Sequence, residues 1–510
     1  MSTSQLRRNA RDLGTLDEKV IYLDMPSTIC STPRSLTRAQ KTVLLAILRN
    51  PAVTPALRAF LLSFAAVVGP RILNITALAL RRRDRVRKYL SGVKHILLSA
   101  LALNELPIFW AALLASSISF SRITEIIVFK LSKSERYSRL SAFIATMLAS
   151  GCTLRWHQRL LKRDATKYIS LPAEEQVKKR QEHGRTIDNT LFTVTSAIDY
   201  LYRRAGVAAQ YKSLHGISPP DYRTTDIYGF VASATIVMYA WFYHPTRLPK
   251  SYNHWITKFA EMDTNLLAAL RLVKSGDFIY GKDTGCAHIL APSCDKLGLP
   301  TEYGDPAVTV PIPCSIVHAN KAENCEVHAA LRFLRAFTSA LAIYIPLNMA
   351  FLFRARRRLK LQHMTDALFS ACRSASFLGM FVALAWYSVC FTRTRAGPYL
   401  FPKVKRLRWD DTVGPALGSF MCGWSVLLEN PRRRGELALF VAPRALGAFL
   451  PEDFDKFHEY AECAAFSIAY AVLFSAAMNA RKAWPPGLPN KDVRLRGVVG
   501  NALMAVLSKS

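Results

Sequence analysis

The sequence predicts an all-α, polytopic integral membrane protein, and three observations indicate this fold class. Apolar residues make up 51% of the 510-residue chain, and its mean hydropathy is positive, at +0.12. Lys and Arg outnumber Asp and Glu by 68 to 36. The basic runs stand at the ends of apolar segments, which is typical of multi-pass proteins with cationic loops. A nucleic-acid-binding protein would instead carry basic patches on polar domains, so no nucleic-acid partner is expected.

Apolar stretches separated by charged connectors predict roughly eight to ten membrane-associated helices. No long stretch shows the alternation that is typical of a β-strand. The first stretches are interrupted or short, whereas the fifth is a clear span with an aromatic end, as expected at a membrane interface. In chain order the stretches are 56–80, 95–119, 139–156, 186–204, 226–244, 333–353, 367–391, 412–429, 436–450 and 461–480.

The charge and hydropathy pattern divides the chain into five segments. The first and last segments are polar or basic, and the middle three carry the apolar stretches. The segments are a polar, flexible lead (1–55), membrane helices with basic connectors (56–225), a helical hairpin with an amphipathic helix and a Cys/His loop (226–360), further membrane helices (361–480) and a basic tail (481–510). Segments 143–201 and 416–449 resemble each other, which suggests two related halves.

An acidic residue interrupts the stretch 95–119, which is otherwise long enough to cross about 30 Å of hydrocarbon. Glu105, with Pro107 close by, is expected to face protein or water rather than lipid, because a lipid-facing carboxylate is costly. A carboxylate in a broken span is one way to build a polar pathway. The sequence therefore also permits a transporter or channel that uses Glu105.

An amphipathic helix is predicted over residues 252–274. Its apolar residues recur at helical spacing and share one face, whereas Lys258, Glu261, Asp263 and Lys274 share the other. Such a helix lies on the membrane surface or packs on the helical bundle. The apolar face consists of Trp255, Ile256, Phe259, Met262, Leu266, Leu267, Leu270 and Val273.

Four potential metal ligands follow in one short run. Cys314, His318, Cys325 and His328 form the pattern C-x3-H-x6-C-x2-H. Zinc prefers four Cys and His ligands, although the six-residue separation is shorter than in the usual zinc finger. Three interpretations are open: a structural zinc site, a disulfide such as Cys314–Cys325 in an oxidising compartment, or residues that fold the loop and cap the next helix.

Small residues recur every four positions in the stretch 412–429, at Gly414, Gly418 and Cys422. This spacing lets helix backbones approach closely, within the chain or between two chains. The following stretch carries basic residues that are candidates for contacts with lipid headgroups, and plain anchoring on the basic side of the membrane is the alternative. These residues are Arg432, Arg433, Arg434 and Arg444.

Three stretches resemble the fungal branch of the transmembrane protein 135 family. "FYHPTRLPKSYNHWI" (242–256) and "PCSIVHANKAENCEVHAALRFLRAF" (313–337), followed by "IYIPL", are similar to the cysteine-rich membrane region of that family. "GSFMCGWSVLLENPRRRGELALFVAPRAL" (418–446) is similar to its C-terminal part, which is related to a superfamily of inner-mitochondrial translocase subunits and a peroxisomal membrane protein. The resemblance covers about residues 90–480.

The resemblance implies a multi-pass protein of mitochondrial or peroxisomal membranes that acts in organelle dynamics or lipid homeostasis. It implies no catalytic residues, and we expect no enzymatic activity and no cofactor other than the structural zinc considered above. The expected partners are membrane lipids, a second copy of the chain or other membrane proteins.

Overall fold

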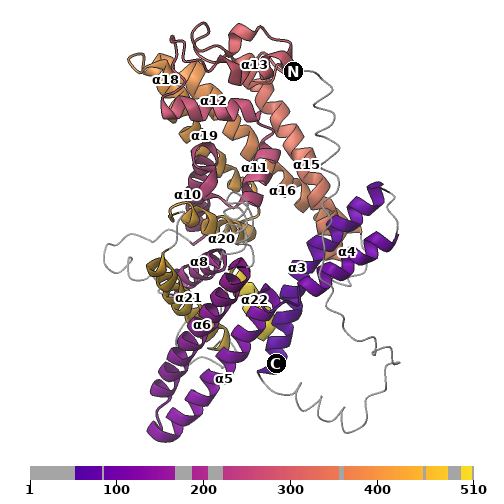
Figure 1. The fold of residues 1–510 in the computed structure, drawn as a ribbon, viewed down its shortest axis with the longest axis vertical. Helices are drawn as coiled ribbons and strands as arrows, with labels where there is room; N and C mark the ends of the chain where they lie inside the picture. The colour runs from indigo at the N-terminus through magenta and orange to yellow at the C-terminus, as the bar shows by residue number, and fades with distance from the viewer. Residues whose placement is uncertain are drawn as a thin grey trace. The chain divides into compact units, whose positions relative to one another are not determined.

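In the computed structural model, every regular element of the described residues is a helix (Figure 1). The prediction of an all-α fold is confirmed for this part of the chain. The predicted lead over residues 1–55 lies almost wholly outside it. The structure describes residues 52–82, 86–166, 186–204, 222–354, 361–451, 455–479 and 495–507, all within one unit that begins at Pro51.

Five described helices are long and apolar enough to cross a membrane, at Val53–Ala79, Leu106–Ser132, Cys325–Ala350, Leu361–Leu400 and Lys456–Met478. Large apolar side chains on them face outward: Leu73 is 71% exposed, Leu131 80% and Phe369 73%. Such a surface suits lipid rather than water. The chain thus has the helices of a multi-span membrane protein, and the count of eight to ten membrane-associated helices stays a prediction.

One group of helices packs around α5 (Leu106–Ser132), α6 (Glu135–Thr166) and α21 (Lys456–Asn479). Helix α5 pairs with α6 and with α3 (Val53–Arg82), and α21 packs against α6 and α8 (Ile187–Arg204). Phe109, Phe466 and Tyr470 are fully buried in this core. The helix α4 (Val86–Ser99) packs on α3. Burial of these large side chains supplies the main stabilisation of the group.

The predicted basic tail over 481–510 includes residues 495–507, which the structure describes. These residues include the helix α22 (Gly497–Leu507), whose residues Val499, Leu503 and Val506 are buried in the same core. The apolar run "GVVGNALMAVL" follows a charged stretch. Because the segment is basic on average, its overall composition does not reveal this run. Residues 495–507 are therefore a structural part of the bundle.

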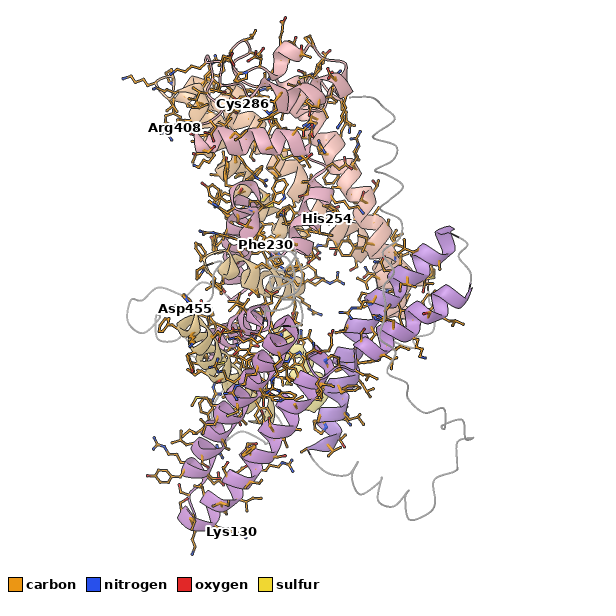
Figure 2. The ribbon with its side chains drawn as sticks, viewed as in Figure 1. Lys130, Phe230, His254, Cys286, Arg408 and Asp455 are labelled. Atoms are coloured by element: carbon orange, nitrogen blue, oxygen red, sulfur yellow. The ribbon has the colours of Figure 1, made fainter. Side chains whose placement is uncertain are left out.

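A second group of helices contains α10 (Tyr222–Tyr243), α15 (Cys325–Arg354), α16 (Leu361–Cys390), α19 (Gly414–Gly423) and α20 (Pro431–Gly447). Helix α15 pairs with α16 as a hairpin, and α10 packs against both α19 and α20. Phe230 of α10, labelled in Figure 2, packs edge-to-face on Phe377 of α16 with ring centroids 5.7 Å apart. Helix α10 was predicted as a clear span, but it is not one of the five, because polar and aromatic side chains lower its hydropathy.

Short helices complete this group. Their bounds are η1 (Pro245–Arg247), α11 (Lys250–Ala260), α12 (Thr264–Ser275), α13 (Ala287–Leu297), η2 (Thr301–Gly304), α14 (Cys314–Val317), η3 (Phe391–Ala396), α17 (Gly397–Leu400), α18 (Arg406–Arg408), η4 (Trp409–Val413) and η5 (Trp424–Leu428). The two groups of helices meet where α8 packs on α20, with the rings of Phe192 and Phe440 6.5 Å apart. These two helices belong to the segments that resemble each other, and the two related halves stay a prediction.

The prediction that Glu105 lies inside a membrane span is wrong. Helix α4 ends at Ser99, and Glu105 is the N-cap of α5, with extended backbone angles. Pro107 follows in the first turn of α5, where a proline lacks only an N–H that would be unpaired anyway. Residues 100–105 therefore form a turn that separates two helices, and Glu105 does not interrupt a single helix.

The small residues of α19 lie where the helix meets α16. A Cβ atom on Gly418 would stand 2.7 Å from Val389 Cγ2 and 2.9 Å from the carbonyl oxygen of Ala385. Gly414 packs against the carbonyl of Trp409, and Cys422 is fully buried. The structure thus places the three predicted packing residues at contacts within the chain.

We expect Gly418→Ala to destabilise the protein by about 1–3 kcal/mol, because the added methyl overpacks the contact between α19 and α16. The measurement is the apparent Tm of the detergent-purified protein by tryptophan fluorescence. Gly229→Ala in α10 is the matched control, since its Cβ would meet no atom within 4 Å. An equal Tm for Gly418→Ala and the wild type would contradict the tight contact.

Candidate functional site

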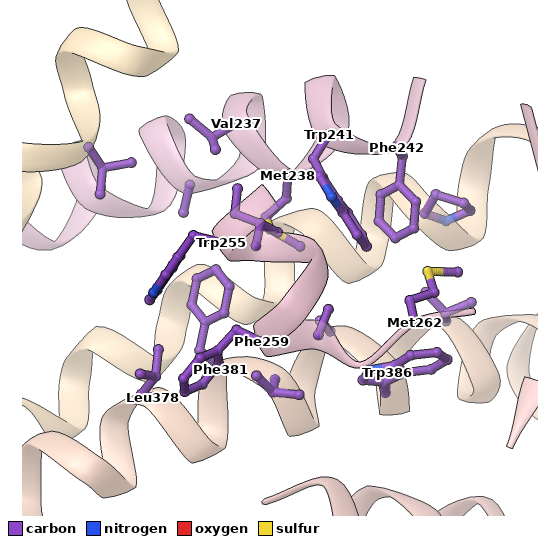
Figure 3. A pocket seen from close by; sticks show the side chains of 18 of the residues that line it. Val237, Met238, Trp241, Phe242, Trp255, Phe259, Met262, Leu378, Phe381 and Trp386 are labelled. Carbon is purple, nitrogen blue, oxygen red and sulfur yellow. The ribbon is translucent and has the colours of Figure 1, made fainter. Parts of the chain in front are cut away.

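A cavity of about 290 Å³ lies within the second group of helices (Figure 3). Side chains from α10, α11, α12, α15, α16, α19 and α20 line it, and nearly all are apolar or aromatic. Trp241 and Met238 of α10 face Phe381 and Trp386 of α16 across the space, and Trp255 of α11 lies between them (Figure 3). Pockets of this kind, apolar with a few polar groups, are typical ligand sites.

A break in the predicted amphipathic helix shapes one wall of the pocket. The segment 252–274 forms two helices, because Glu261 takes a left-handed conformation at φ 46° and ends α11. Asp263 then caps α12: its Oδ1 accepts a hydrogen bond of 3.1 Å from the backbone N–H of Asn265. As a result Trp255 and Phe259 of α11 and Leu266 of α12 line the same cavity. The alternative of packing on the bundle is confirmed, and the prediction of a single helix is wrong.

A buried ion pair lies at one end of the pocket. Arg393 Nε stands 2.5 Å from Asp410 Oδ1, and both side chains are less than a tenth exposed. The hydroxyl of Tyr280 donates to Asp410 Oδ2 over 2.6 Å, and Arg393 also donates to the carbonyl of Ile312. Burial, together with the charge of Asp410, raises the pKa of Tyr280, so its hydroxyl keeps the proton that it donates. The pocket is therefore apolar along its walls and charged at one end.

Both partners of this ion pair lie on π-helical turns. Arg393 is in η3 and Asp410 is in η4, and a Gly-Pro dipeptide, Gly397-Pro398 or Gly414-Pro415, follows each turn. Proline has no N–H, so the carbonyl four residues earlier lacks its usual helical partner. For Pro415 that carbonyl belongs to Asp411, and it accepts a hydrogen bond of 2.6 Å from the Tyr243 hydroxyl. The two Gly-Pro dipeptides are the signal by which the sequence could have located these turns.

The four predicted metal ligands come together beside the same end of the pocket, with one residue that the sequence did not indicate. The ligand atoms of Cys314, His318 and Cys325 lie within 4.8 Å of one another, and so do those of His318, His328 and Cys390. Cys390 is the last residue of α16, and its Sγ is 3.5 Å from His318 Nε2. Because Cys390 lies far along the chain from the other four, no local spacing could reveal it.

The two histidines of this cluster are stacked and fully buried. Their ring centroids are 4.2 Å apart, and His318 and His328 are at most 2% exposed. His318 Nδ1 lies 2.9 Å from the carbonyl of Ala322, to which it donates, so Nε2 keeps its lone pair on the side of Cys390. The Nε2 of His328 accepts a hydrogen bond of 3.1 Å from Arg332 Nε instead. His328 Nδ1 is buried without a partner among the described residues.

The cysteines of the described residues are all free thiols. Burial raises the pKa of the Cys314 thiol, which keeps it protonated in the absence of a metal or other cation. The disulfide Cys314–Cys325 is thus not formed in this structure, although the two thiols are in contact. Metal binding, disulfide formation and a purely structural role of the loop all stay predictions.

The four candidate headgroup arginines differ in their surroundings. Arg433 donates to Ser374 Oγ over 3.1 Å, and Arg434 donates to the carbonyls of Glu429 and Leu427 at the start of α20. Arg432 is exposed. The guanidinium carbon of Arg444 lies 4.0–5.1 Å from the ring centroids of Phe440, Tyr252 and Phe192, and it contacts aromatic rings rather than an exposed surface.

Chemically, the site offers an apolar space that can hold a hydrocarbon chain, hydrogen-bonding groups at one end, and a thiol–imidazole cluster next to that end. Ile312 and Arg393 line the pocket, and both lie within three residues of a cysteine of the cluster. No family model, curated protein or solved structure matches this chain.

Proposed function

We propose that the protein binds a long-chain lipid in the pocket of the second helix group and acts in lipid homeostasis of an organelle membrane. The observation that carries the proposal is the cavity of about 290 Å³ with walls of apolar and aromatic side chains. Burying a methylene group in such walls stabilises a bound chain by about 0.8 kcal/mol. A membrane protein meets lipids at high concentration, and these supply ligands of the required chemistry.

The contrast between the pocket and the outer helix faces supports binding of a specific lipid rather than general contact with the bilayer. Phe369 on α16 points outward and is 73% exposed, whereas Phe377 on the same helix is 5% exposed and lines the pocket. Arg393 and Asp410 give the pocket an end that can recognise a polar headgroup. Burying two charged groups is costly, so a buried pair retained in a pocket lining is a candidate functional group.

Mitochondrial or peroxisomal membranes are the proposed location, on the resemblance of residues 242–256, 313–337 and 418–446 to the transmembrane protein 135 family. The protein is proposed to be non-enzymatic, with membrane lipids and membrane proteins as its partners. Fluorescent tagging with markers of both organelles tests the location, and a plasma-membrane signal would contradict it.

A transporter is the alternative, from a different functional class. Because Glu105 caps α5 instead of lying within a span, we expect Glu105→Gln to leave any lipid transfer between vesicles unchanged. Flux that depends on Glu105 in proteoliposomes would favour the transporter and would contradict the lipid-binding proposal.

Leu378→Trp is expected to weaken lipid binding, because the larger side chain of α16 fills part of the pocket that Leu378 lines. The probe is cis-parinaric acid, a fluorescent fatty acid, added to the detergent-purified protein. We expect a Kd at least about tenfold higher than that of the wild type, which corresponds to about 1.4 kcal/mol.

Leu368→Trp is the matched control for this experiment. It makes the same substitution on the same helix, but Leu368 is 47% exposed and lies outside the pocket lining. Its Kd should equal that of the wild type. Equal weakening by both variants, or no saturable binding to the wild type, would contradict the pocket as the lipid site.

A further inference from the structure

We propose that a zinc ion binds at Cys314, His318, Cys325 and Cys390, and that His328 lies outside the coordination sphere. This set contains Cys390 of α16 in place of His328, the fourth residue of the sequence pattern. Three thiolates and one imidazole form a common ligand set of structural zinc sites. The inference concerns a metal site and does not depend on lipid binding in the pocket.

The distance between His318 and Cys390 fits two ligands of a tetrahedral zinc ion. Zinc–sulfur bonds of about 2.3 Å and zinc–nitrogen bonds of about 2.0 Å place a nitrogen and a sulfur ligand about 3.6 Å apart. The distance from His318 Nε2 to Cys390 Sγ is 3.5 Å. The ligand atoms of Cys314, His318 and Cys325 lie within 4.8 Å of one another, and Cys390 is joined to this set through His318.

The hydrogen bonds of the two histidines decide which of them is the ligand. His318 Nδ1–H donates to the Ala322 carbonyl, which is the usual outer-shell partner of a metal-binding histidine and leaves Nε2 free to coordinate. His328 Nε2 is occupied by the Arg332 guanidinium, so its proton is on Nδ1. An N–H group cannot bind a metal, but it can donate to a zinc-bound thiolate. His328 Nδ1 is buried and has no partner among the described residues.

The chemistry of the ligands favours zinc over other metal ions. Zinc binds cysteine as the thiolate, and the charge of the ion offsets the negative charge of the sulfur ligands. Soft sulfur ligands favour zinc over magnesium or calcium. The proposed ion would join three elements: the loop at α14, the first residue of α15 and the last residue of α16. It would hold the loop against the polar end of the pocket.

The test measures zinc in the full chain, purified in detergent without chelators, by inductively coupled plasma mass spectrometry. We expect about one zinc ion per chain in the wild type and a loss of bound zinc in Cys390→Ser. Cys294→Ser is the matched control, because Cys294 is also buried but lies outside the cluster, and it should keep its zinc. His328→Gln should also retain zinc, with an affinity lowered by at most about 10- to 100-fold, as for an outer-shell residue.

Cobalt substitution provides a readout that does not require a variant to fold. The cobalt-loaded wild type should show the visible ligand-field bands of a tetrahedral site and thiolate charge-transfer bands in the near ultraviolet. Several results would overturn the proposal: no zinc and no tetrahedral cobalt spectrum in the wild type, a disulfide between cluster cysteines in alkylated protein, full zinc retention by Cys390→Ser, or loss of zinc from His328→Gln as complete as from Cys390→Ser.

Discussion

Replacing Asp410 by alanine is expected to destabilise the protein by about 3–5 kcal/mol, because it leaves the Arg393 guanidinium buried without a counter-ion. The side chain of Arg393 is 6% exposed, and Asp410 Oδ1 lies 2.5 Å from its Nε. The Tyr280 hydroxyl also loses its acceptor. The readout is the apparent Tm of the protein in detergent, followed by tryptophan fluorescence.

A double variant separates the charge effect from the loss of packing. Arg393→Met with Asp410→Leu removes both charges and keeps much of the apolar volume, so most of the lost stability should return. Tyr280→Phe should cost only about 1 kcal/mol, since it removes one hydrogen bond and leaves the ion pair intact. A Tm of Asp410→Ala within one degree of the wild type would show that the pair is not buried in the folded protein.

Arg496→Met is expected to destabilise the protein by about 2–5 kcal/mol, because it leaves the partly buried Asp226 without its cation and Asp199 with Arg203 as its remaining cation. Arg496 Nη2 lies 2.7 Å from Asp199 Oδ1 and 2.8 Å from Asp226 Oδ1. These three side chains are between 10% and 17% exposed, so solvent screens the interaction only weakly. Thermal unfolding in detergent measures the effect, which should include release of α22 from the core.

Two controls locate the effect of Arg496. Arg408→Met also removes an arginine from an ion pair, but Arg408 is 67% exposed and stands 3.5 Å from Asp411, so its loss should change the stability by less than about 1 kcal/mol. Protease digestion of Arg496→Met should cut the C-terminal residues before the rest of the chain. Protection of these residues equal to that in the wild type would contradict an anchoring role of Arg496.

The sequence predicts the fold class and the apolar face over 252–274, because both follow from hydrophobic periodicity. The apolar face over 252–274 became the pocket wall formed by Trp255, Phe259 and Leu266. The break between α11 and α12 was missed, although Asp263-Thr264-Asn265 is a helix-start signal. Continuous apolar spacing on both sides of Asp263 outweighed that signal.

Contacts between distant parts of the chain could not be predicted from local spacing. Cys390 joins the cluster only because α16 packs on α15 and brings its last residue to the loop at α14. The pairing of Arg393 with Asp410 likewise depends on the packing of two π-helical turns. Arg496 lies among other basic residues in the sequence, so composition assigned it to a charged tail. Its ion pairs with Asp199 and Asp226 depend on contacts between distant parts of the chain.

The position of Trp386 gives the protein an internal optical reporter. Its indole lines the pocket, packs edge-to-face on His328 at 5.3 Å, and carries the Arg332 guanidinium carbon 4.4 Å from its ring centroid. A hydrocarbon chain in the pocket changes the polarity on one side of this fluorophore, and a change in the charge of the cluster alters the electric field on the other. The emission difference between the wild type and Trp386→Phe therefore allows both events to be followed in one cuvette without a label.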